Sequence, residues 1–231
     1  MLAINEVAIC HGKVNTDGAH YQTYWRVLDE AEQTHAGNLK NALLQKRYVE
    51  IHGRLRKLLA QMLDQPPEKI RIKKAGHGKP YLADHPELSF NLSHSADRMM
   101  FAMGWQCQLG VDMEICKPRI NMSALVDKCF AEEEATYWNK LPEDRKKTEF
   151  YRFWTRKEAF VKATGYGIAL GLNHCVINPE NFTEFLRVPA KCGHASIWHL
   201  LDLDLEEGIF CTVVADKEIT SVNLMNFKES E

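Results

Sequence analysis

The sequence has no long hydrophobic run, no marked excess of charge and no zinc-binding pattern, and each absence excludes a class of protein. No stretch of this 231-residue chain approaches the roughly 18 apolar residues that a membrane-spanning helix needs. The N-terminus lacks a basic segment followed by an apolar one, so we expect a cytoplasmic protein without a secretory leader. The net charge of -2 argues against binding to nucleic acids, which are polyanions.

Cysteine and histidine are present, but they do not form a disulfide or metal pattern. The seven cysteines are scattered, odd in number and without a C-x-x-C pair, which is typical of free thiols in a reducing compartment. The ten histidines include no H-E-x-x-H spacing, so we expect no zinc site. With 45% apolar and 26% charged residues, the chain has the composition of a globular protein with a sizeable core.

The order of the expected elements indicates an α+β fold in two parts. Helices are predicted from apolar periodicity over residues 38–63, 121–129, 131–139 and 147–164, with Pro66-Pro67 ending the first and the polar segment 141–144 preceding the last. Strands are predicted over 4–10, 70–72, 88–92, 99–105, 109–115, 174–178, 195–203, 208–215 and 219–225. Because each part runs from helix into several strands, we divide the chain into residues 1–109 and 110–231.

Two acidic residues stand on one face of the strand predicted over 109–115. Side chains alternate along a strand, so Asp112 and Glu114 point the same way while Val111 and Met113 point into a core. Carboxylates placed this close repel each other unless a cation lies near them. The alternative is an ordinary solvated strand face, and these residues alone do not decide between the two.

The helix predicted over 147–164 supplies a third acid. Trp154, Glu158 and Lys162 are four residues apart and share one helix face, so Glu158 belongs to an ion pair or to a site. Three carboxylates without a nearby cysteine or histidine suit a hard cation, Mg²⁺ before Ca²⁺. Because Mg²⁺ bound by few carboxylates takes further ligands from water and phosphates, the acids predict a phosphate-bearing substrate.

Basic and hydroxyl side chains that suit phosphate oxygens occur in the first half. Lys79 flanks the loop 76–80, Arg47 lies on the first long helix, and Ser93 and His94 end a predicted strand. Each has a plain alternative: basic residues on a helix usually form its wet face, and a single histidine after a strand is more often structural. Only the set points to a phosphate site.

Four motifs, in this order, resemble those of the 4′-phosphopantetheinyl transferase superfamily. They read G-K-P-Y from Gly78, F-N-L-S-H-S from Phe90, G-V-D-M-E from Gly110 and F-W-T-R-K-E-A-F-V-K from Phe153. The length resembles the long, single-chain (surfactin-synthetase-activating) type that serves nonribosomal peptide, polyketide and related synthases, rather than the short trimeric type of fatty-acid synthesis. The pairing of the last two motifs is the most specific part of the resemblance.

The resemblance implies a fold and a reaction. The fold is a pseudo-dimer of two similar α+β halves, in which residues 1–109 bind the phosphates and adenine of coenzyme A and residues 110–231 hold the metal and the carrier protein. The reaction moves the 4′-phosphopantetheine arm of coenzyme A onto a serine of an apo acyl or peptidyl carrier protein and releases adenosine 3′,5′-bisphosphate. The expected cofactor is Mg²⁺, with Mn²⁺ as an alternative.

Carried over motif by motif, the resemblance also implies roles for single residues. The metal ligands are Asp112, Glu114 and Glu158, the catalytic residues are Asp112, Glu158 and Lys162, and the coenzyme A contacts are Arg47, Lys79, Pro80, Ser93, His94 and Lys162. Glu158 is the candidate base for the serine proton, a role in tension with metal ligation because a metal lowers carboxylate basicity.

The segment before the first long helix departs from the family pattern. The family often holds the 3′-phosphate of coenzyme A with basic residues there, but over residues 32–40 this chain has Lys40 as its only fixed cation. Lys40, Arg47 and His35 are the candidates, and Arg47 fits best by its place early in the helix.

The carrier protein and two rival functions complete the expectations. Carrier proteins present acidic helices, so a docking surface is expected at residues 117–122 with Leu125 and Phe130, although apolar residues at helical spacing are more often core. We expect a monomer, because one chain already contains both halves, and no nucleic-acid or membrane partner. The alternatives are a catalytically degenerate binder of coenzyme A or carrier proteins and an Mg²⁺-dependent phosphoesterase.

Overall fold

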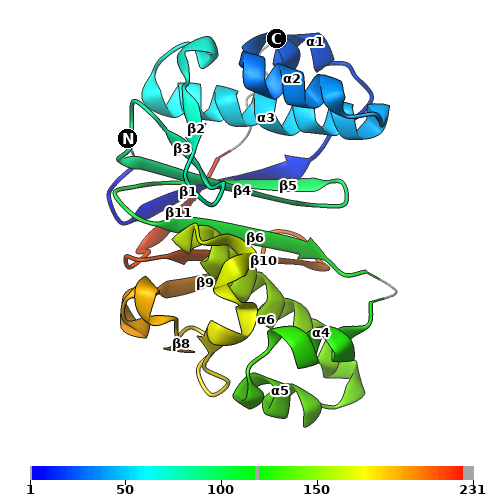
Figure 1. The fold of residues 1–231 in the computed structure, drawn as a ribbon, viewed down its shortest axis with the longest axis vertical. Coiled ribbons are helices and arrows are strands. Elements are labelled where there is room, and N and C mark those ends of the chain that lie inside the picture. Colours follow the sequence, from blue (N-terminus) through cyan, green and yellow to red (C-terminus); the bar gives the residue numbers. More distant parts are fainter. Residues whose placement is uncertain (1, 118–119, 226–231) are drawn as a thin grey trace.

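The computed structural model describes residues 2–117 and 120–225, which form four layers (Figure 1). Two sheets face each other in the middle, with helices α1–α3 over the outer face of the first and α4–α6 over the outer face of the second. The helices are α1 (Tyr21–Val27), α2 (Glu30–Asn38), α3 (Ala42–Leu63), α4 (Met122–Cys129), α5 (Glu132–Asn139) and α6 (Glu143–Thr164). The α+β class expected from the sequence is confirmed.

The two sheets are built from strands of mostly antiparallel direction. The first has the order β11-β1-β5-β4, in which only β11 and β1 are parallel, and the second has the order β6-β10-β9. Their strands are β1 (Glu6–Lys13), β4 (Leu88–Ser95), β5 (Arg98–Trp105), β6 (Leu109–Ile115), β9 (His199–Leu203), β10 (Ile209–Ala215) and β11 (Ser221–Leu224). Two-stranded ribbons are formed by β2 (Ile72–Lys74) with β3 (Pro80–Leu82) and by β7 (Val176–Ile177) with β8 (Phe185–Arg187).

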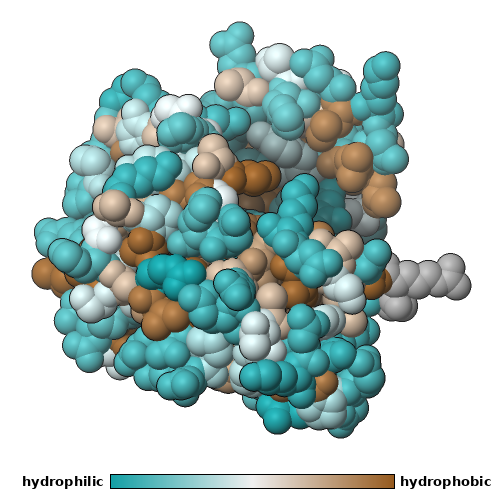
Figure 2. All heavy atoms as spheres, turned by 60° about the horizontal axis from the view of Figure 1, so that its bottom comes forward, coloured by the Kyte–Doolittle hydropathy of each residue, from teal (hydrophilic) through white to brown (hydrophobic). Residues whose placement is uncertain are grey.

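Apolar side chains fill the spaces between the layers. Along β1, Ala8 and Cys10 pack with the α3 side chains, whereas Val7 and Ile9 pack with residues of the second sheet. This alternation places one core between α3 and the first sheet and another between the sheets. A third and larger core surrounds α6. Outside the cores, apolar and polar side chains are interspersed on the face drawn in Figure 2, and no described helix is long and apolar enough to cross a membrane.

Several predicted boundaries are wrong, and capping residues give the reasons. The first long helix begins at Ala42 rather than at residue 38, because the Asn41 side chain accepts hydrogen bonds from the amides of Leu43 and Leu44. The last long helix begins at Glu143, directly after Pro142, so the predicted polar break at 141–144 is shorter than expected. Gly165, at φ 73°, ends this helix directly after the predicted last residue, 164.

Smaller shifts concern the short strands. The strand predicted over 70–72 occupies Ile72–Lys74, that over 174–178 covers only Val176–Ile177, and the start of 195–203 is a short 3₁₀ turn at Ala195–Ile197. The short strand β8 was not predicted. The second sheet begins with Leu109, the last residue of the predicted first part, and β11 from the second part joins the first sheet beside β1. The division into residues 1–109 and 110–231 stays a prediction.

A seam of side chains joins the two sheets at the edge strands β4 and β6. Asn91, Ser93 and Ser95 are alternate residues of β4, so all three point the same way. Their side-chain oxygens accept hydrogen bonds from the backbone amides of Val111, Met113 and Ile115 at 2.9, 3.2 and 3.3 Å. The F-N-L-S-H-S motif therefore holds the halves in a fixed register.

Gly110 is required where β6 passes against α6. A Cβ at this position would lie 2.1 Å from the carbonyl oxygen of Ala159 and 2.3 Å from the amide nitrogen of Ala163.

We expect Gly110→Ala to lower the free energy of unfolding by about 1–3 kcal/mol or more, because the helix has to move away from the strand. Urea unfolding checks this. Gly12→Ala on β1, where a Cβ would meet nothing within 4 Å, is the matched control, and equal urea midpoints for the two variants would contradict the expectation.

Candidate active site

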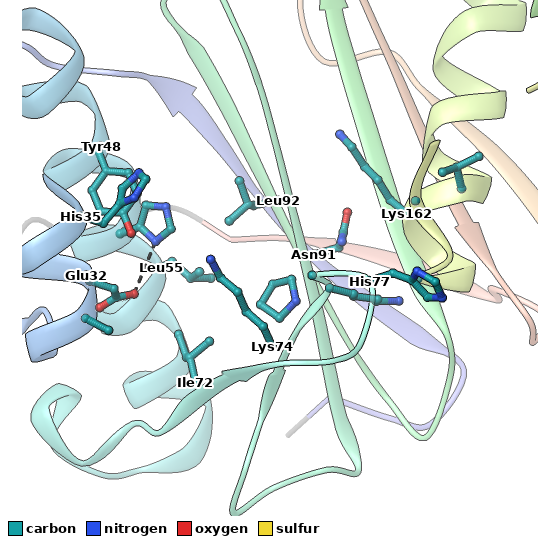
Figure 3. A pocket seen from close by; sticks show the side chains of 18 of the residues that line it. Glu32, His35, Tyr48, Leu55, Ile72, Lys74, His77, Asn91, Leu92 and Lys162 are labelled. Atoms are coloured by element: carbon teal, nitrogen blue, oxygen red, sulfur yellow. Dashed lines mark ion pairs between the residues drawn. The ribbon is translucent and has the colours of Figure 1, made fainter. Parts of the chain in front are cut away.

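A cavity of about 810 Å³ lies between the two halves of the molecule. Its wall comes from α2 and α3 on one side, from α6 and the 3₁₀ turn Gly167–Leu170 on the other, and from β4 and the β2–β3 ribbon between them (Figure 3). Of the residues predicted from the sequence, those that line it directly are His35, Lys79, Pro80, Glu158 and Lys162.

A buried carboxylate forms the centre of a polar cluster beside this cavity. Asp112 on β6 is only 5% exposed. Its Oδ1 atom lies 2.7 Å from the Lys162 ammonium and accepts a hydrogen bond of 2.8 Å from the Ser93 hydroxyl. Lys162 also donates to Ser93 at 2.9 Å. The structure therefore brings together three residues that the sequence assigned to the site from three separate motifs.

The other oxygen of Asp112 has a different environment. Oδ2 is buried without a hydrogen-bond partner among the described residues. Burial raises the pKa of Asp112 above its ordinary value, although the Lys162 ammonium opposes this effect. An orphaned carboxylate oxygen in a buried site is a position where a cation or a donor from a ligand would be favourable.

Glu158 and Glu114 lie close enough to Asp112 to influence its charge and that of each other. Burial and then the negative charge of Asp112 raise the pKa of Glu158, and Glu114 acts in the same direction. Glu114 accepts a hydrogen bond of 2.6 Å from Ser95. The charges of these acids therefore act on one another, but in the described part of the chain no three His, Cys, Asp or Glu residues are close enough together to enclose a metal ion. The predicted metal site stays a prediction.

Arg47 and His94 form a second polar pair beside the first. The Arg47 Nη2 atom lies 3.3 Å from the His94 Nδ1 atom, and the buried Nε of Arg47 has no hydrogen-bond partner within the described residues. Burial lowers the pKa of His94, and the charges of Arg47 and Lys162 lower it further. The pair thus combines an unsatisfied guanidinium donor with an imidazole, an arrangement that suits an anion.

Lys79 has partners that the sequence did not predict. Its ammonium donates to the carbonyl oxygens of Leu109 at 3.0 Å and Ala163 at 2.5 Å, so it ties the loop of the first half to β6 and to the C-terminal end of α6. Burial lowers the pKa of Lys79 from 10.5 to about 8. Its contact with coenzyme A stays a prediction, because in this structure the ammonium is directed at the backbone.

Comparison with known proteins decides the family. Residues 108–214 match the model of the 4′-phosphopantetheinyl transferase superfamily, and residues 15–105 match that of the N-terminal part of 4′-phosphopantetheinyl transferases. A putative 4′-phosphopantetheinyl transferase of Synechocystis sp. is 32% identical over 187 residues, which cover 80% of this chain and 75% of that protein. The chain belongs to the 4′-phosphopantetheinyl transferase superfamily.

Other transferases of this superfamily are similar over shorter spans. HetI of Nostoc sp. is 35% identical over 68% of this chain and 65% of its own length. The transferase psf-1 of Bacillus pumilus is 35% identical over 58% of this chain and 57% of its own length. The family assignment confirms the resemblance drawn from the four motifs.

Two ion pairs, one of them fully buried, fix α6, the helix that carries the transferase motif from Phe153 to Lys162. The Lys157 ammonium lies 2.6 Å from the Glu134 carboxylate of α5, and both side chains are fully buried. One residue earlier, Arg156 forms a bidentate pair with Asp202 of β9. Sequence reasoning missed the partners, since nothing in the spacing of Glu134 or Asp202 links either to α6.

A stack of rings lines the far end of the cavity and was also missed, apart from His35. The Tyr48 ring stacks on His52 with centroids 3.9 Å apart, and the His35 ring is tilted by 45° against Tyr48 with centroids 4.7 Å apart. The spacing of Tyr48 and His52, one helical turn apart on α3, was a readable signal for a shared face. The D-x-x-E pattern of Asp29 and Glu32 was a second readable signal, because a capping box of this kind marks the N-terminus of a helix, here α2.

The predicted docking surface is only partly accessible. Met122 and Leu125 are half-buried and pack against the core around α6, and Phe130 is buried in that core. Pro118 and Arg119 lie outside the described residues. The alternative given for this stripe, a core role, therefore holds for Phe130, and docking at the remaining residues stays a prediction.

The unusual environment of Lys79 predicts a pH dependence of stability. Between pH 8 and 10.5 the folded protein gives up the Lys79 proton while the unfolded chain retains it, so the charge-burial penalty disappears as pH rises. We expect the free energy of unfolding of the wild type to increase relative to that of Lys79→Met over this interval, measured by urea unfolding at several pH values. Lys73→Met, at an exposed lysine of β2, is the control. A difference that does not change with pH would show that Lys79 is not the group involved.

Proposed function

We propose that this protein transfers the 4′-phosphopantetheine arm of coenzyme A to a serine of an apo acyl or peptidyl carrier protein. The observation that carries the proposal is the cluster of Asp112, Ser93 and Lys162 beside a cavity large enough for a nucleotide co-substrate. Membership of the superfamily supports the reaction class.

The reaction breaks the phosphoanhydride bond of the coenzyme A diphosphate and forms a phosphoester with the serine. The serine oxygen of the carrier protein attacks the phosphorus next to pantetheine, the diphosphate bond on its far side breaks, and adenosine 3′,5′-bisphosphate leaves. Arg47, His94 and Lys162 would hold the diphosphate, since Arg47 lies 3.3 Å from His94 and the charges of Arg47 and Lys162 both act on His94. Negative charge that grows on the phosphate oxygens is stabilised most by donors already in place, and Lys162 is such a donor.

The chemistry of the three carboxylates, rather than their spacing in this structure, would suit a hard cation such as Mg²⁺ or Mn²⁺. Asp112, Glu114 and Glu158 would hold it, with the orphaned Oδ2 of Asp112 as the best-prepared ligand atom. Their looser spacing is compatible with Mg²⁺, which keeps waters and substrate oxygens in its shell. When bound, the ion offsets the negative charge of the diphosphate.

The pairing of Lys162 with Asp112 links the two binding events. If Lys162 turns toward a phosphate, the buried Asp112 carboxylate loses its compensating charge, which is costly in a buried site. A cation near Asp112 removes that cost. Diphosphate and cation are therefore expected to bind cooperatively.

Glu158 has two possible assignments, and both follow from its place between the cavity and Asp112. As a base it takes the proton of the attacking serine. As a metal ligand it helps to hold the cation. We propose the base as its main role, because it lines the cavity where a carrier serine would enter.

The remaining proposals concern the setting of the reaction. We propose a cytoplasmic monomer, since the cavity is built from one chain. We propose that the carrier protein approaches over the exposed part of α4, near Met122 and Leu125.

Loss of either charge in the cluster should abolish most of the transfer. We expect Lys162→Met and Asp112→Asn each to lower kcat/KM by about 100-fold or more, because each removes charge at the reacting diphosphate. The measurement is intact-protein mass spectrometry of an apo carrier protein incubated with the enzyme, coenzyme A and Mg²⁺. The product is the carrier protein with one phosphopantetheine added.

Exposed residues of the same type, away from α4 and from the cavity, provide matched controls for this experiment. Asp204→Asn and Lys69→Met should keep the wild-type rate, and EDTA should stop the reaction of the wild type. If no carrier protein gains mass in any reaction with wild-type enzyme, the proposed function is wrong. If EDTA leaves the rate unchanged, the metal proposal fails while the transferase proposal stands.

A single substitution separates the two roles of Glu158. We expect Glu158→Gln to lose most of its turnover but to bind Mn²⁺ within about threefold of wild-type affinity, since two carboxylates remain and Mn²⁺ takes water ligands readily. Electron paramagnetic resonance measures the Mn²⁺ binding without reference to activity. Near-normal turnover would remove the base role, and a complete loss of Mn²⁺ binding would make Glu158 chiefly a ligand.

A further inference from the structure

Three exposed apolar residues begin the helix that carries Arg47. Ala42, Leu43 and Leu44 are consecutive, and the two leucines are 58% and 51% exposed. Among the large apolar side chains that the structure describes, these leucines are the only exposed pair adjacent in sequence. Single exposed apolar residues are common on protein surfaces, but a run of three is unfavourable unless it serves a function.

The first turn of α3 is uncovered but well ordered. Successive residues of a helix are about 100° apart, so the exposure of three in a row means that the described part of the chain covers no side of this turn. The Asn41 side chain accepts hydrogen bonds from the amides of Leu43 and Leu44 at 2.9 and 3.2 Å. Apolar side chains on a backbone that is already fixed lose little conformational entropy when a partner covers them.

The two leucines lie close to the proposed reaction site. Arg47 follows Leu43 by one helical turn, and its guanidinium lies 3.3 Å from His94 near the end of β4. The seam of hydrogen bonds between β4 and β6 pairs residues in the same direction along both strands, so the two strands end at the same side. Figure 1 shows the start of α3 and the start of α4 on this side of the molecule, with the end of β6 between them.

The size of a protein interface makes contact with this turn expected. A specific complex buries about 800 Å² on each partner, which corresponds to a disc of about 16 Å radius. Four residues of α-helix advance by only about 6 Å, so Leu43 falls well inside such a disc centred on the pair of Arg47 and His94. A protein that brings a serine to this pair therefore reaches the start of α3.

The charge around the leucines indicates the kind of partner. Residues 38–48 contain three cations, Lys40, Lys46 and Arg47, and no acid. An apolar centre with a basic rim is complementary to an acidic protein surface that carries exposed apolar side chains. The acidic helices expected of a carrier protein have this character.

We propose that Leu43 and Leu44 form a docking element for the carrier protein on the first half of the molecule. The carrier protein then spans the ends of β4 and β6 and contacts α3 as well as α4. The leucines pack against its apolar side chains, and the lysines beside them face its acidic residues. This inference rests on the proposed transferase function.

The test removes the apolar surface without touching the reaction site. We expect the double variant Leu43→Ser, Leu44→Ser to raise KM for an apo acyl carrier protein by about tenfold, because two buried contacts are lost on the protein partner alone. KM for coenzyme A and kcat should stay unchanged, with both measured by mass spectrometry of the carrier protein. Calorimetry of the apo carrier protein with enzyme in the absence of coenzyme A should show a similar loss of affinity, and this readout does not depend on turnover.

Two other exposed leucines give a matched control. Leu186 on β8 and Leu224 on β11 are 47% and 59% exposed, and β11 lies at the opposite edge of the first sheet from β4. The double variant Leu186→Ser, Leu224→Ser removes the same apolar groups at a distance from the site. It should leave KM and affinity for the carrier protein unchanged.

The basic rim gives a second test. Lys46 donates to a backbone carbonyl, that of Asp17, at 3.5 Å, so its substitution breaks no ion pair among the described residues. We expect Lys46→Glu to lower kcat/KM for the carrier protein by about two- to fivefold at low ionic strength and by less at high ionic strength, because salt screens exposed charges. An equal effect at both ionic strengths would contradict an acidic partner at this surface.

Three results would overturn the inference. The first is an unchanged KM and affinity for the carrier protein in the Leu43→Ser, Leu44→Ser variant. The second is a raised KM for coenzyme A in that variant, which would place the leucines in the co-substrate site. The third is a wild-type dimer that this variant dissociates in sedimentation without loss of carrier affinity, which would make a second copy the occupant. Absence of transfer to any carrier protein, with carrier binding weakened as expected, would instead contradict the proposed function alone.

Discussion

The side-chain seam between β4 and β6 is the interaction on which the site depends. Neither strand has a backbone partner across this junction, because β4 and β6 are edge strands of different sheets. Asn91, Ser93 and Ser95 replace the missing ladder by accepting hydrogen bonds from the β6 amides. Ser93 also donates to Asp112, so the same hydroxyl that joins the halves orients the central carboxylate. The hydrogen bonds that hold the two halves together therefore also orient the central carboxylate of the site.

Helix α6 adds the second constraint by sending consecutive side chains in different directions. Successive residues of a helix are about 100° apart, and here Arg156 reaches the second sheet, Lys157 reaches α5 and Glu158 reaches the cavity. The buried pair of Lys157 and Glu134 does not argue for high stability, since burying two charges costs about as much as their attraction returns. The effect of the pair is geometric. Glu134 also accepts hydrogen bonds from the amides of Ala131 and Ile177, so its carboxylate is held in place and fixes the rotation of α6 through Lys157.

The main helices and strands and the acidic residues of the site could be predicted because the sequence patterns that indicate them are local. Periodicity located α3 and α6, and alternation along β6 placed Asp112 and Glu114 on one face. It failed for α2, whose nine residues have no apolar stripe and are recognised only by their capping box. It also failed for Lys79, whose partners Leu109 and Ala163 are 30 and 84 residues away and are backbone carbonyls. A contact with a backbone atom leaves no trace in the side-chain pattern.

The acidity of the far end of the cavity follows from how α2 begins. Glu32 accepts the amide of Asp29 at 3.1 Å and Asp29 accepts the amide of Glu32 at 2.9 Å, so the two acids cap the helix reciprocally. The same two carboxylates compensate the buried charge of Arg56. A basic residue in place of Glu32 would remove a helix cap and leave Arg56 without half of its compensation. In this chain the negative charge of Glu32 is therefore a requirement of the fold, whatever ligand the cavity receives.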